Sequence, residues 1–388
     1  MSDLSWRNSY LKLSPNVALK RLEEPYIYHM GRDELYEIDE RAEKFMLTCD
    51  GSSTGAELTS DGEFVEFCID EGLLEACAKP VPVNNIIDIA PRPSLRYLEL
   101  QLLHKCNIRC RHCYLGEQSG HIMELGDALK ICREFASSGG LRLLISGGEP
   151  LLYPHLEELI HETSKLKIRR VILTNGTLIN EDNISRLNVE NIQFSLDGWE
   201  KGNDYLRGSG NFAKTIRGID IAGKAGIPVS IASMIHSTNL NEFEQMEGFI
   251  KEIEATEWGI DIMCEAGLIL DNTEIIPPLE DAVPLMRHAF GGGYHGSSDG
   301  YACGRHLMTV MPNCDAVKCG FYTDQVLGNA RNGLINSWMK LSHIPLSKLE
   351  CMDCDVIDEC AGGCRFRASH RYAPDTVMCR LFKQKSFS

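Results

Sequence analysis

The sequence is poor in positive charge and contains no long apolar run. Its 39 Lys and Arg residues are outnumbered by 55 Asp and Glu residues, which gives a formal net charge of −16. Phosphate binding needs a concentrated basic surface, so this balance argues against a nucleic-acid partner. No apolar run reaches membrane-spanning length and no apolar N-terminal signal segment is present, so we expect no membrane association.

Cysteine, in contrast, is abundant, with 16 residues in a chain of 388. A chain without a secretory signal is expected in the reducing cytoplasm, where disulfides are rare and clustered cysteines serve as metal ligands. The length exceeds that of one compact core and predicts two or three domains. We therefore expect a cytoplasmic, multidomain protein whose cysteines bind metal.

One cysteine-rich stretch organises the chain. Cys106, Cys110 and Cys113 follow the strand-like residues 96–103 at a C-x3-C-x2-C spacing, so they lie on a loop at the C-terminal end of a strand. Three thiolates on a short loop hold three irons of a cubane cluster and leave the fourth iron open to a ligand. A zinc knuckle or a chance cluster is the alternative, but zinc sites usually combine paired C-x2-C units with a fourth ligand nearby.

Strand and helix patterns alternate from residue 95 onward. Helical patterns such as residues 126–138 and 212–225 separate the strands, and this alternation predicts that the strands are parallel. The expected strands are residues 96–103, 142–146, 170–174, 191–195, 229–233 and 258–262. They predict an α/β fold with a partial (β/α)6 TIM-like barrel, in which chemistry gathers at the strand C-termini.

The cysteine spacing, Tyr114 directly after it and the turn Gly147-Gly148-Glu149-Pro150 resemble the signature of the radical SAM superfamily. The resemblance implies that the open iron of a [4Fe-4S] cluster binds S-adenosylmethionine (SAM). One electron then cleaves SAM to methionine and a 5′-deoxyadenosyl radical. The resemblance also implies that Glu149 receives the methionyl amine and that Arg207 grips the carboxylate by a planar two-point contact. A solvated arginine at a helix start is the alternative for Arg207.

Further positions near strand ends complete the SAM site that the resemblance implies. Ser195 and Asp197 are expected at the ribose hydroxyls, and Ser233 with residues 265–267 at the edge of the adenine. The full set of expected SAM-binding residues is Tyr114, Gly147, Gly148, Glu149, Asn175, Ser195, Asp197, Arg207 and Ser233. Cys132 and Cys264 fall within helix and strand-end patterns and are interpreted as packing residues.

The N-terminal part has a pattern of its own. It predicts a hairpin of strands at 26–30 and 34–39, helices at 40–48 and 62–70, and a wing at 71–76. This order resembles the PqqD-like recognition element of ribosomally synthesised and post-translationally modified peptides (RiPPs), a winged-helix-like domain. The resemblance implies that the leader of a precursor peptide adds to an exposed strand edge. A generic winged-helix appendage without a ligand is the alternative.

Half of the cysteines fall after residue 300. Eight thiols suffice for two four-cysteine clusters, and the block resembles the SPASM extension of radical SAM enzymes, which implies two auxiliary iron–sulfur clusters. By this resemblance the distal cluster is held by Cys351, Cys354, Cys360 and Cys379, and the proximal cluster by Cys303, Cys319 and Cys364. Zinc at either site is the alternative, because four thiolates also suit zinc.

Two positions depart from the SPASM pattern. Cys314 replaces the glycine of the Gly-x4-Cys hairpin, which makes it a fourth proximal ligand, a reactive thiol or a tolerated variant. Because the pattern supplies only three proximal thiolates and Cys314 lies close to Cys319 on a predicted hairpin, we hypothesise that Cys314 closes the proximal cluster. Gly320 stands where members that oxidise sulfatases carry an aspartate base, which argues against a sulfatase maturase.

These patterns predict a recognition domain at 1–85, a proline-bounded linker at 86–94, a radical SAM core at 95–295 and a SPASM domain at 296–388. We expect an oxygen-sensitive radical SAM oxidoreductase that takes hydrogen from a ribosomally made peptide and installs a cross-link or related oxidation. Flavodoxin or ferredoxin is the expected electron donor. One alternative is oxidation of a small molecule, such as a tetrapyrrole side chain in haem-type biosynthesis. The other is a non-catalytic iron–sulfur carrier or peptide-binding scaffold. The sequence identifies no general base.

Overall fold

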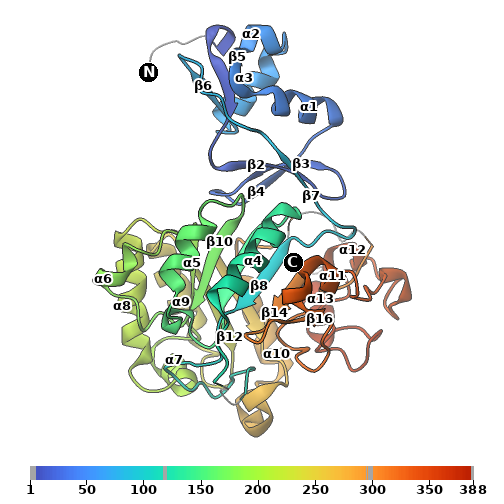
Figure 1. The fold of residues 1–388 in the computed structure, drawn as a ribbon. Helices are drawn as coiled ribbons and strands as arrows, with labels where there is room; N and C mark the ends of the chain where they lie inside the picture. The colour runs from blue at the N-terminus through green and yellow to red at the C-terminus, as the bar shows by residue number, and fades with distance from the viewer. Residues whose placement is uncertain (1–5, 117–119, 294, 296–299, 386–388) are drawn as a thin grey trace.

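The computed structural model describes residues 6–116, 120–293, 295 and 300–385. Figure 1 shows a small N-terminal module standing on one end of a larger α/β body, with the C-terminal part against the side of that body. The first five residues of the expected recognition domain lie outside the described residues. So does the expected boundary between core and C-terminal domain at residue 296.

A curved sheet of mainly parallel strands forms the centre of the body. Its strand order is β13-β12-β11-β10-β9-β8-β14-β15-β16, so the six strands of the predicted barrel lie side by side in sequence order. They are β8 (Tyr97–Gln101), β9 (Arg142–Ser146), β10 (Arg169–Thr174), β11 (Asn191–Ser195), β12 (Val229–Ile235) and β13 (Glu257–Ile262). The α/β fold with a partial, TIM-like barrel is confirmed, and the predicted strand positions agree with these bounds to within a few residues.

Helices connect the parallel strands and cover the outside of the sheet (Figure 1). They are α4 (Leu125–Ser137), α5 (Leu156–Thr163), α6 (Glu181–Ile184), α7 (Glu200–Arg207), α8 (Asn211–Lys224) and α9 (Phe243–Glu252), with the 3-10 helix η2 (Pro150–Leu152). Helix α4 illustrates the reason: Ala128, Ile131 and Phe135 recur at helical spacing on one face, and all three are buried in the main core.

The N-terminal module contains two small sheets, ordered β5-β1-β6 and β4-β3-β2-β7. Its strands are β1 (Tyr10–Leu13), β2 (Val17–Arg21), β3 (Pro25–His29), β4 (Glu34–Glu37), β5 (Asp50–Thr54), β6 (Leu74–Cys77) and β7 (Ile87–Ile89). Its helices are η1 (Trp6–Asn8), α1 (Glu40–Thr48), α2 (Gly55–Leu58) and α3 (Gly62–Asp70). Asp39 and Asp61 cap α1 and α3 as side-chain acceptors. The expected linker at 86–94 contains β7, which pairs in parallel with β2.

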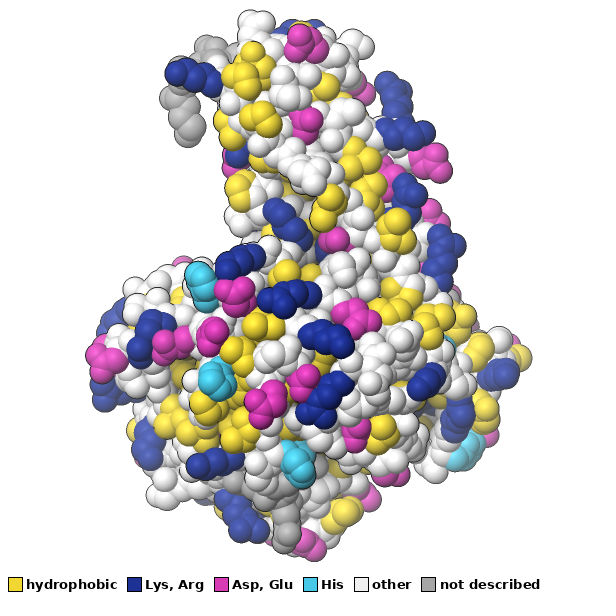
Figure 2. All heavy atoms as spheres, viewed as in Figure 1, with side chains coloured by type: hydrophobic (Ala, Val, Ile, Leu, Met, Phe, Trp, Pro, Cys, Tyr) yellow, Lys and Arg dark blue, Asp and Glu magenta, His cyan; other side chains and the backbone are white. Residues whose placement is uncertain are grey.

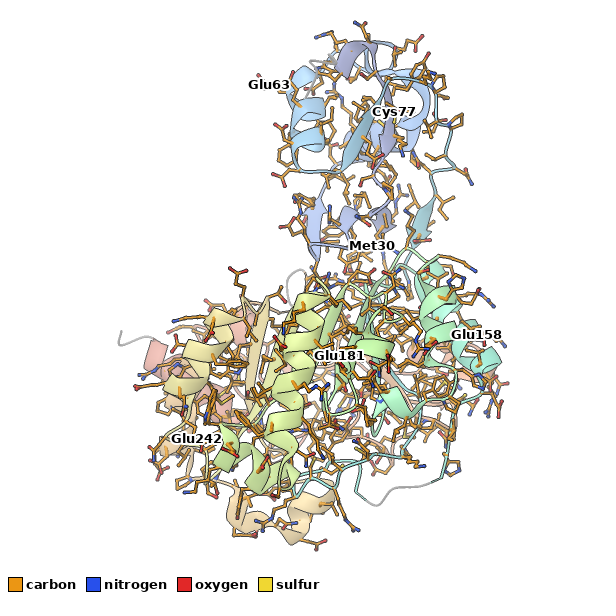
Figure 3. All side chains as sticks on the ribbon, turned by 90° about the vertical axis from the view of Figure 1, so that its left-hand side faces the viewer. Met30, Glu63, Cys77, Glu158, Glu181 and Glu242 are labelled. Atoms are coloured by element: carbon orange, nitrogen blue, oxygen red, sulfur yellow. The ribbon has the colours of Figure 1, made fainter. Side chains whose placement is uncertain are left out.

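Buried polar contacts fix the module to the barrel. The Asp33 carboxylate lies 2.5 Å from the Arg142 guanidinium, and the Lys20 ammonium donates to Asp88 and to the Lys167 carbonyl, both at 2.8 Å. Met30 lies at this junction (Figure 3), and its carbonyl accepts from Arg169 at 2.8 Å. Arg142 and Arg169 are the first residues of β9 and β10, so the module sits at the N-terminal ends of the barrel strands.

The C-terminal part extends the central sheet and then becomes irregular. Strand β14 (Leu307–Val310) pairs in parallel with β8, and β15 (Asp315–Val317) and β16 (Gly328–Asn329) follow antiparallel. The remaining elements are η3 (Gly267–Asp271), η4 (Thr273–Ile275), α10 (Leu279–Ala282), η5 (Val283–His288), η6 (Ala330–Asn332), α11 (Leu334–Trp338), η7 (Leu346–Lys348), α12 (Ile357–Cys360) and α13 (Thr376–Lys385). The Trp338 indole donates to the Pro93 carbonyl at 2.7 Å and anchors α11 beside the barrel.

On the face drawn in Figure 2, basic and acidic side chains are interspersed over both the module and the body, without one dominant basic patch. This distribution agrees with the acidic composition of the chain. Among the described residues, no helix combines the length and apolar character needed to cross a bilayer.

Candidate functional site

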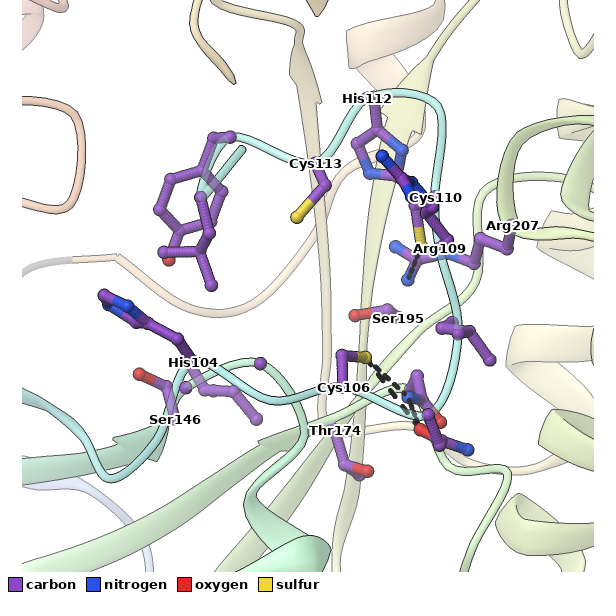
Figure 4. A pocket seen from close by; sticks show the side chains of 18 of the residues that line it. His104, Cys106, Arg109, Cys110, His112, Cys113, Ser146, Thr174, Ser195 and Arg207 are labelled. Atoms are coloured by element: carbon purple, nitrogen blue, oxygen red, sulfur yellow. Dashed lines mark hydrogen bonds between the residues drawn. The ribbon is translucent and has the colours of Figure 1, made fainter. Parts of the chain in front are cut away.

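A cavity of about 680 Å³ opens at the C-terminal ends of β8 to β11 (Figure 4). Cys106, Cys110 and Cys113 all line it, as the C-x3-C-x2-C spacing predicted for one loop. Of the other predicted residues, Tyr114, Gly147, Gly148, Asn175, Ser195 and Arg207 also line the cavity. The structure therefore brings most of the predicted SAM-binding set to one place.

Tight backbone packing holds the cysteine loop against the turn after β9. The Gly148 amide donates to the Leu103 carbonyl at 2.7 Å, and the Glu149 amide donates to the Lys105 carbonyl at 3.0 Å. A Cβ on Gly148 would lie 2.3 Å from the Lys105 carbonyl oxygen, so only glycine allows this approach. The sequence suggested that the two glycines admit a ligand, whereas the structure shows that Gly148 first admits the cysteine loop.

An amide network positions Cys106. Asn175 donates its side-chain amide to the Asn107 carbonyl oxygen at 2.9 Å and approaches the Cys106 sulfur at 3.8 Å (Figure 4). Asn107 in turn donates to the Thr177 hydroxyl at 2.7 Å. Neutral amides of this kind stabilise a thiolate or a cluster sulfur by hydrogen bonding, without adding a competing charge.

Arg207 lies between Cys110 and Asp197 in the cavity wall. Its Nε donates to the Asp197 carboxylate at 2.6 Å, and its terminal nitrogen approaches the Cys110 sulfur at 3.9 Å. Both charged side chains are buried. Burial alone would raise the pKa of Asp197, but the charges of Arg207 and His112 prevail and hold that pKa below its ordinary value. Arg207 is thus no solvated arginine at a helix start.

Asp197 does not reach the cavity as predicted. Its second oxygen accepts from the Met234 amide at 2.8 Å, so both carboxylate oxygens are already engaged. Ser233 does not line the cavity either, and its hydroxyl donates to the Leu196 carbonyl at 2.5 Å and accepts from the Trp258 indole at 2.9 Å. Both side chains are buried behind the residues that line the cavity, so their predicted contacts with a ribose and an adenine remain predictions.

We expect Asp197→Asn to lower the free energy of unfolding by about 3–5 kcal/mol, because it leaves the buried Arg207 guanidinium without its counter-charge. Combining it with Arg207→Met should cost less than the sum of the two single changes. Urea denaturation of the full chain without cofactors measures both. Glu181→Gln is the matched control, since Glu181 pairs with Arg217 at 3.1 Å on the exposed surface and its loss should not be measurable. An equally silent Asp197→Asn would contradict this structural role.

Glu149 also lies behind the cavity wall. Its carboxylate accepts from the Thr174 hydroxyl at 2.7 Å, the Asn175 amide at 3.0 Å and the Leu151 amide at 3.1 Å. Burial raises the pKa of Glu149 to about 7 despite these three donors. A nearby ammonium group would favour the ionised form, so the environment suits a carboxylate that receives a cationic ligand.

Sequence reasoning missed Glu99, which lines the same cavity from the middle of β8. Its carboxylate accepts from Ser146 at 2.8 Å, from Thr309 at 2.7 Å and from Tyr114 at 3.3 Å. The available signal was a charged residue between two leucines of a strand, which in a barrel points to the interior. His104 and His112 line the cavity as well, without a sequence signal beyond their nearness to the cysteines.

The C-terminal cysteines fall into two groups. In one, the charges of Cys379 and Cys351 act on Cys360, and those of Cys351 and Cys354 act on Cys379. In the other, Cys364 interacts with Cys303, and its charge also reaches Cys319. The SPASM resemblance implied this division, and the role of these thiols as cluster ligands remains a prediction.

Cys264 joins the second group, although the sequence analysis interpreted it as a packing residue. Its thiol interacts directly with that of Cys364. The available signal was its position two residues after β13, at the strand end where the other motifs gather.

Cys314 corrects the hypothesis that it closes the proximal cluster. It occupies the turn between β14 and β15 with φ of 68°, and its buried side chain belongs to the main hydrophobic core. Its sulfur approaches the Asp127 carboxylate on α4 at 3.8 Å, and its charged neighbours are Arg331, Asp127 and Asp315. The turn thus directs the thiol toward α4 and away from Cys303 and Cys319.

All sixteen cysteines lie in the described residues, and none forms a disulfide. Within the same residues, no three His, Cys, Asp or Glu side chains are gathered closely enough for a single metal ion. A cubane cluster is larger and binds each thiolate through a different iron, so a wider set of thiols suits it.

Residues 100–250 match the domain model of the Radical SAM superfamily. Such a domain implies a [4Fe-4S] cluster and SAM. The three thiols on the cavity wall, held beside a buried arginine, fit both groups.

Relatives of known sequence include peptide-modifying and haem-forming proteins. The AdoMet-dependent heme synthase of Methanosarcina barkeri is 29% identical over 198 residues, which cover 49% of this chain and 56% of that protein. The PqqA peptide cyclase of Methylorubrum extorquens is 25% identical over 342 residues, covering 74% and 84%. The chain spans about half the length of the haem synthases it matches.

The fold resembles that of Streptococcus suis SuiB bound to S-adenosylmethionine, with a TM-score of 0.69 at 18% identity over 95% of this chain and 99% of SuiB. SuiB bound to its precursor peptide SuiA gives a TM-score of 0.67 at 17% identity, covering 96% and 100%. At these identities the likeness concerns the fold, which extends through both terminal parts of the chain.

Proposed function

We propose that this chain is a radical SAM enzyme that modifies a ribosomally made peptide by abstracting hydrogen from it and installing a cross-link or related oxidation. The proposal of radical chemistry depends on one observation: a single cavity wall brings together Cys106, Cys110, Cys113 and Arg207. When bound there, a [4Fe-4S] cluster with SAM supplies a 5′-deoxyadenosyl radical.

The residues of the cavity divide the work of holding SAM. Arg207 keeps its terminal nitrogens on the cavity side while Asp197 holds its Nε at 2.6 Å, which fixes the guanidinium for a carboxylate. Asn175 and Ser195 offer neutral polar groups from the ends of β10 and β11. Glu149 supports Asn175 through its backbone amide, and its ionised form suits the methionyl ammonium.

The N-terminal module offers an open strand edge for a leader peptide. Strand β4 is the last strand of its sheet and pairs only with β3 among the described residues. The Ile38 amide donates to the Pro25 carbonyl at 3.1 Å, so by antiparallel alternation the backbone groups of Leu35 and Glu37 point outward. An extended peptide pairing with this edge would lie beside α3, because Tyr36 contacts Phe67 with ring centres 6.4 Å apart.

The module and the cavity lie at opposite ends of the barrel strands. Strand β10 has six residues and is therefore about 20 Å long at about 3.3 Å per residue. If the leader binds to β4 and the reacting residue lies in the cavity, the peptide segment between them must span at least the length of a barrel strand. This arrangement favours a long, flexible precursor peptide.

The two groups of C-terminal cysteines support the proposal of two auxiliary iron–sulfur clusters. Cys351, Cys354, Cys360 and Cys379 would hold the distal one. Auxiliary clusters would take up the electron that the oxidised substrate gives away, and an external flavodoxin or ferredoxin would supply the electron for SAM cleavage.

Oxidation of a tetrapyrrole side chain is the second candidate. Its support is the 29% identity to the AdoMet-dependent heme synthase of Methanosarcina barkeri. That likeness covers 49% of the chain, and the peptide proposal is favoured because the PqqA peptide cyclase match covers 74%.

The decisive experiment offers both substrate classes to the reconstituted full chain with SAM and dithionite. The peptide arm contains each short peptide encoded beside the gene, and the tetrapyrrole arm contains iron coproporphyrin. We expect a mass loss of about two hydrogens on one peptide, measured by mass spectrometry, with 5′-deoxyadenosine formed alongside. Turnover of the tetrapyrrole with every peptide unchanged would overturn the peptide proposal.

A further inference from the structure

The SPASM resemblance assigns three thiolates to the proximal auxiliary site, and the structure places the thiol of Cys264, from the barrel, beside one of them. Cys264 follows β13 and is buried. Its thiol interacts with Cys364, which interacts in turn with Cys303. Cys319 belongs to the same group through the charges of Cys364 and Cys303. These interactions thus link four thiols from four separate segments of the chain.

An ion-pair network centred on Arg367 locks two of these segments together. Arg367 donates to the Asp261 carboxylate and to the Ile262 carbonyl at the end of β13, the latter at 3.3 Å. The same guanidinium donates to Asp375 at 2.9 Å, and the Cys364 amide donates to Asp375 at 2.8 Å. The Cys364 loop is therefore fixed to the strand end that carries Cys264, so their proximity does not depend on a mobile loop.

Two cations flank the four sulfurs. The charge of Arg367 acts on Cys264 and Cys364, whereas that of Lys318 acts on Cys303 and Cys319. A cubane with four thiolate ligands is anionic overall, and buried anions require compensating charge or hydrogen bonds. Arg367 and Lys318 would supply such compensating charge beside a cluster bound by these four thiols.

The segment after β13 that carries Cys264 also contacts the cysteine loop of the cavity. The Leu268 amide donates to the Cys113 carbonyl at 2.9 Å, and a Cβ on Gly267 would lie 2.3 Å from that carbonyl oxygen. Residues 264–268 thus lie between the cavity and the C-terminal cysteines.

We infer that Cys264 is the fourth ligand of the proximal auxiliary cluster, together with Cys303, Cys319 and Cys364. The inference rests on the auxiliary clusters of the proposed function. With four thiolates, the cluster has no iron free for a substrate sulfur, which leaves electron transfer as its role. The cluster then lies one short loop away from the cavity.

The test removes the cavity cluster first, so that only auxiliary iron is observed. A full-length parent variant with Cys106, Cys110 and Cys113 changed to Ala is reconstituted anaerobically, and about eight irons are expected for two cubanes. Cys264→Ala and Cys264→Ser are then added separately. After mild oxidation we expect the electron paramagnetic resonance signal of a [3Fe-4S] cluster in both, because an iron without a protein thiolate is readily lost. After reduction, 2-mercaptoethanol should change their spectra but not that of the parent.

Cys314→Ala and Cys132→Ala in the same parent are the matched controls, since both cysteines are buried elsewhere and should leave the spectra unchanged. Retention of the distal cluster signal in every variant reports that the chain is folded. Parent-like spectra of both Cys264 variants would overturn the inference, as would an open-iron signal from Cys314→Ala. A parent that binds no iron at all would instead overturn the auxiliary clusters of the proposed function.

Discussion

Replacing Cys106, Cys110 and Cys113 together by Ala is expected to abolish the formation of 5′-deoxyadenosine. All three thiols line one cavity, and no other cysteine lines it among the described residues, so no neighbouring thiol can replace them. Without the thiolates the cavity cannot hold a cluster, and reductive cleavage of SAM has no electron source. The chain should lose about four irons and keep about eight, as measured by iron analysis and by chromatography of the nucleoside product.

The matched control changes three buried cysteines outside the cysteine groups, Cys49, Cys68 and Cys132. Truncating buried side chains lowers stability modestly, but the iron content and the nucleoside product should remain. Continued SAM cleavage by the Cys106, Cys110 and Cys113 variant would refute the assignment of the cavity as the radical site. Loss of all iron in that variant would overturn the auxiliary clusters of the proposed function.

Phe67→Asp is expected to raise the KM for a leader-bearing peptide at least tenfold while leaving SAM cleavage without peptide unchanged. Phe67 is 46% exposed on α3 beside the open edge of β4. Burying such a side chain against a bound peptide contributes about 1.5–3 kcal/mol, and a tenfold affinity change corresponds to about 1.4 kcal/mol. Steady-state kinetics with the full peptide and with a leaderless peptide separate binding by the module from chemistry at the cavity.

Ile89→Asp is the matched control for this change. Ile89 is 65% exposed and lies on β7, which is the opposite edge of the same four-stranded sheet. It should leave the KM of the peptide unchanged. A Phe67 variant that behaves like the unchanged protein would argue against leader binding at β4, and a selective defect of the Ile89 variant would move the leader to β7. The leaderless peptide should react equally poorly with all three proteins.

Local patterns in the sequence determined the barrel and the cysteine loop. The predicted residues 142–146 and 191–195 coincide with β9 and β11, and the predicted helix 62–70 coincides with α3. These elements are read from neighbouring residues, because apolar periodicity and capping side chains act within a few positions. The C-x3-C-x2-C loop is local in the same sense, so its three thiols were predicted to meet and they line one cavity.

The tertiary structure alone decided which distant side chains meet. Asp197 follows β11 and Ser233 lies within β12, but their buried partners Arg207 and Trp258 hold both side chains behind the residues that line the cavity.

Distant contacts also decide the surroundings of Cys314, which was expected as a cluster ligand, and of Cys264, which was expected as a packing residue. A turn with positive φ directs Cys314 into the core against α4, whereas Arg367 and Asp375 bring the Cys364 loop to the strand end that carries Cys264. Spacing along the chain constrains only short loops, while contacts between distant segments depend on packing and buried charge, which a sequence pattern does not record.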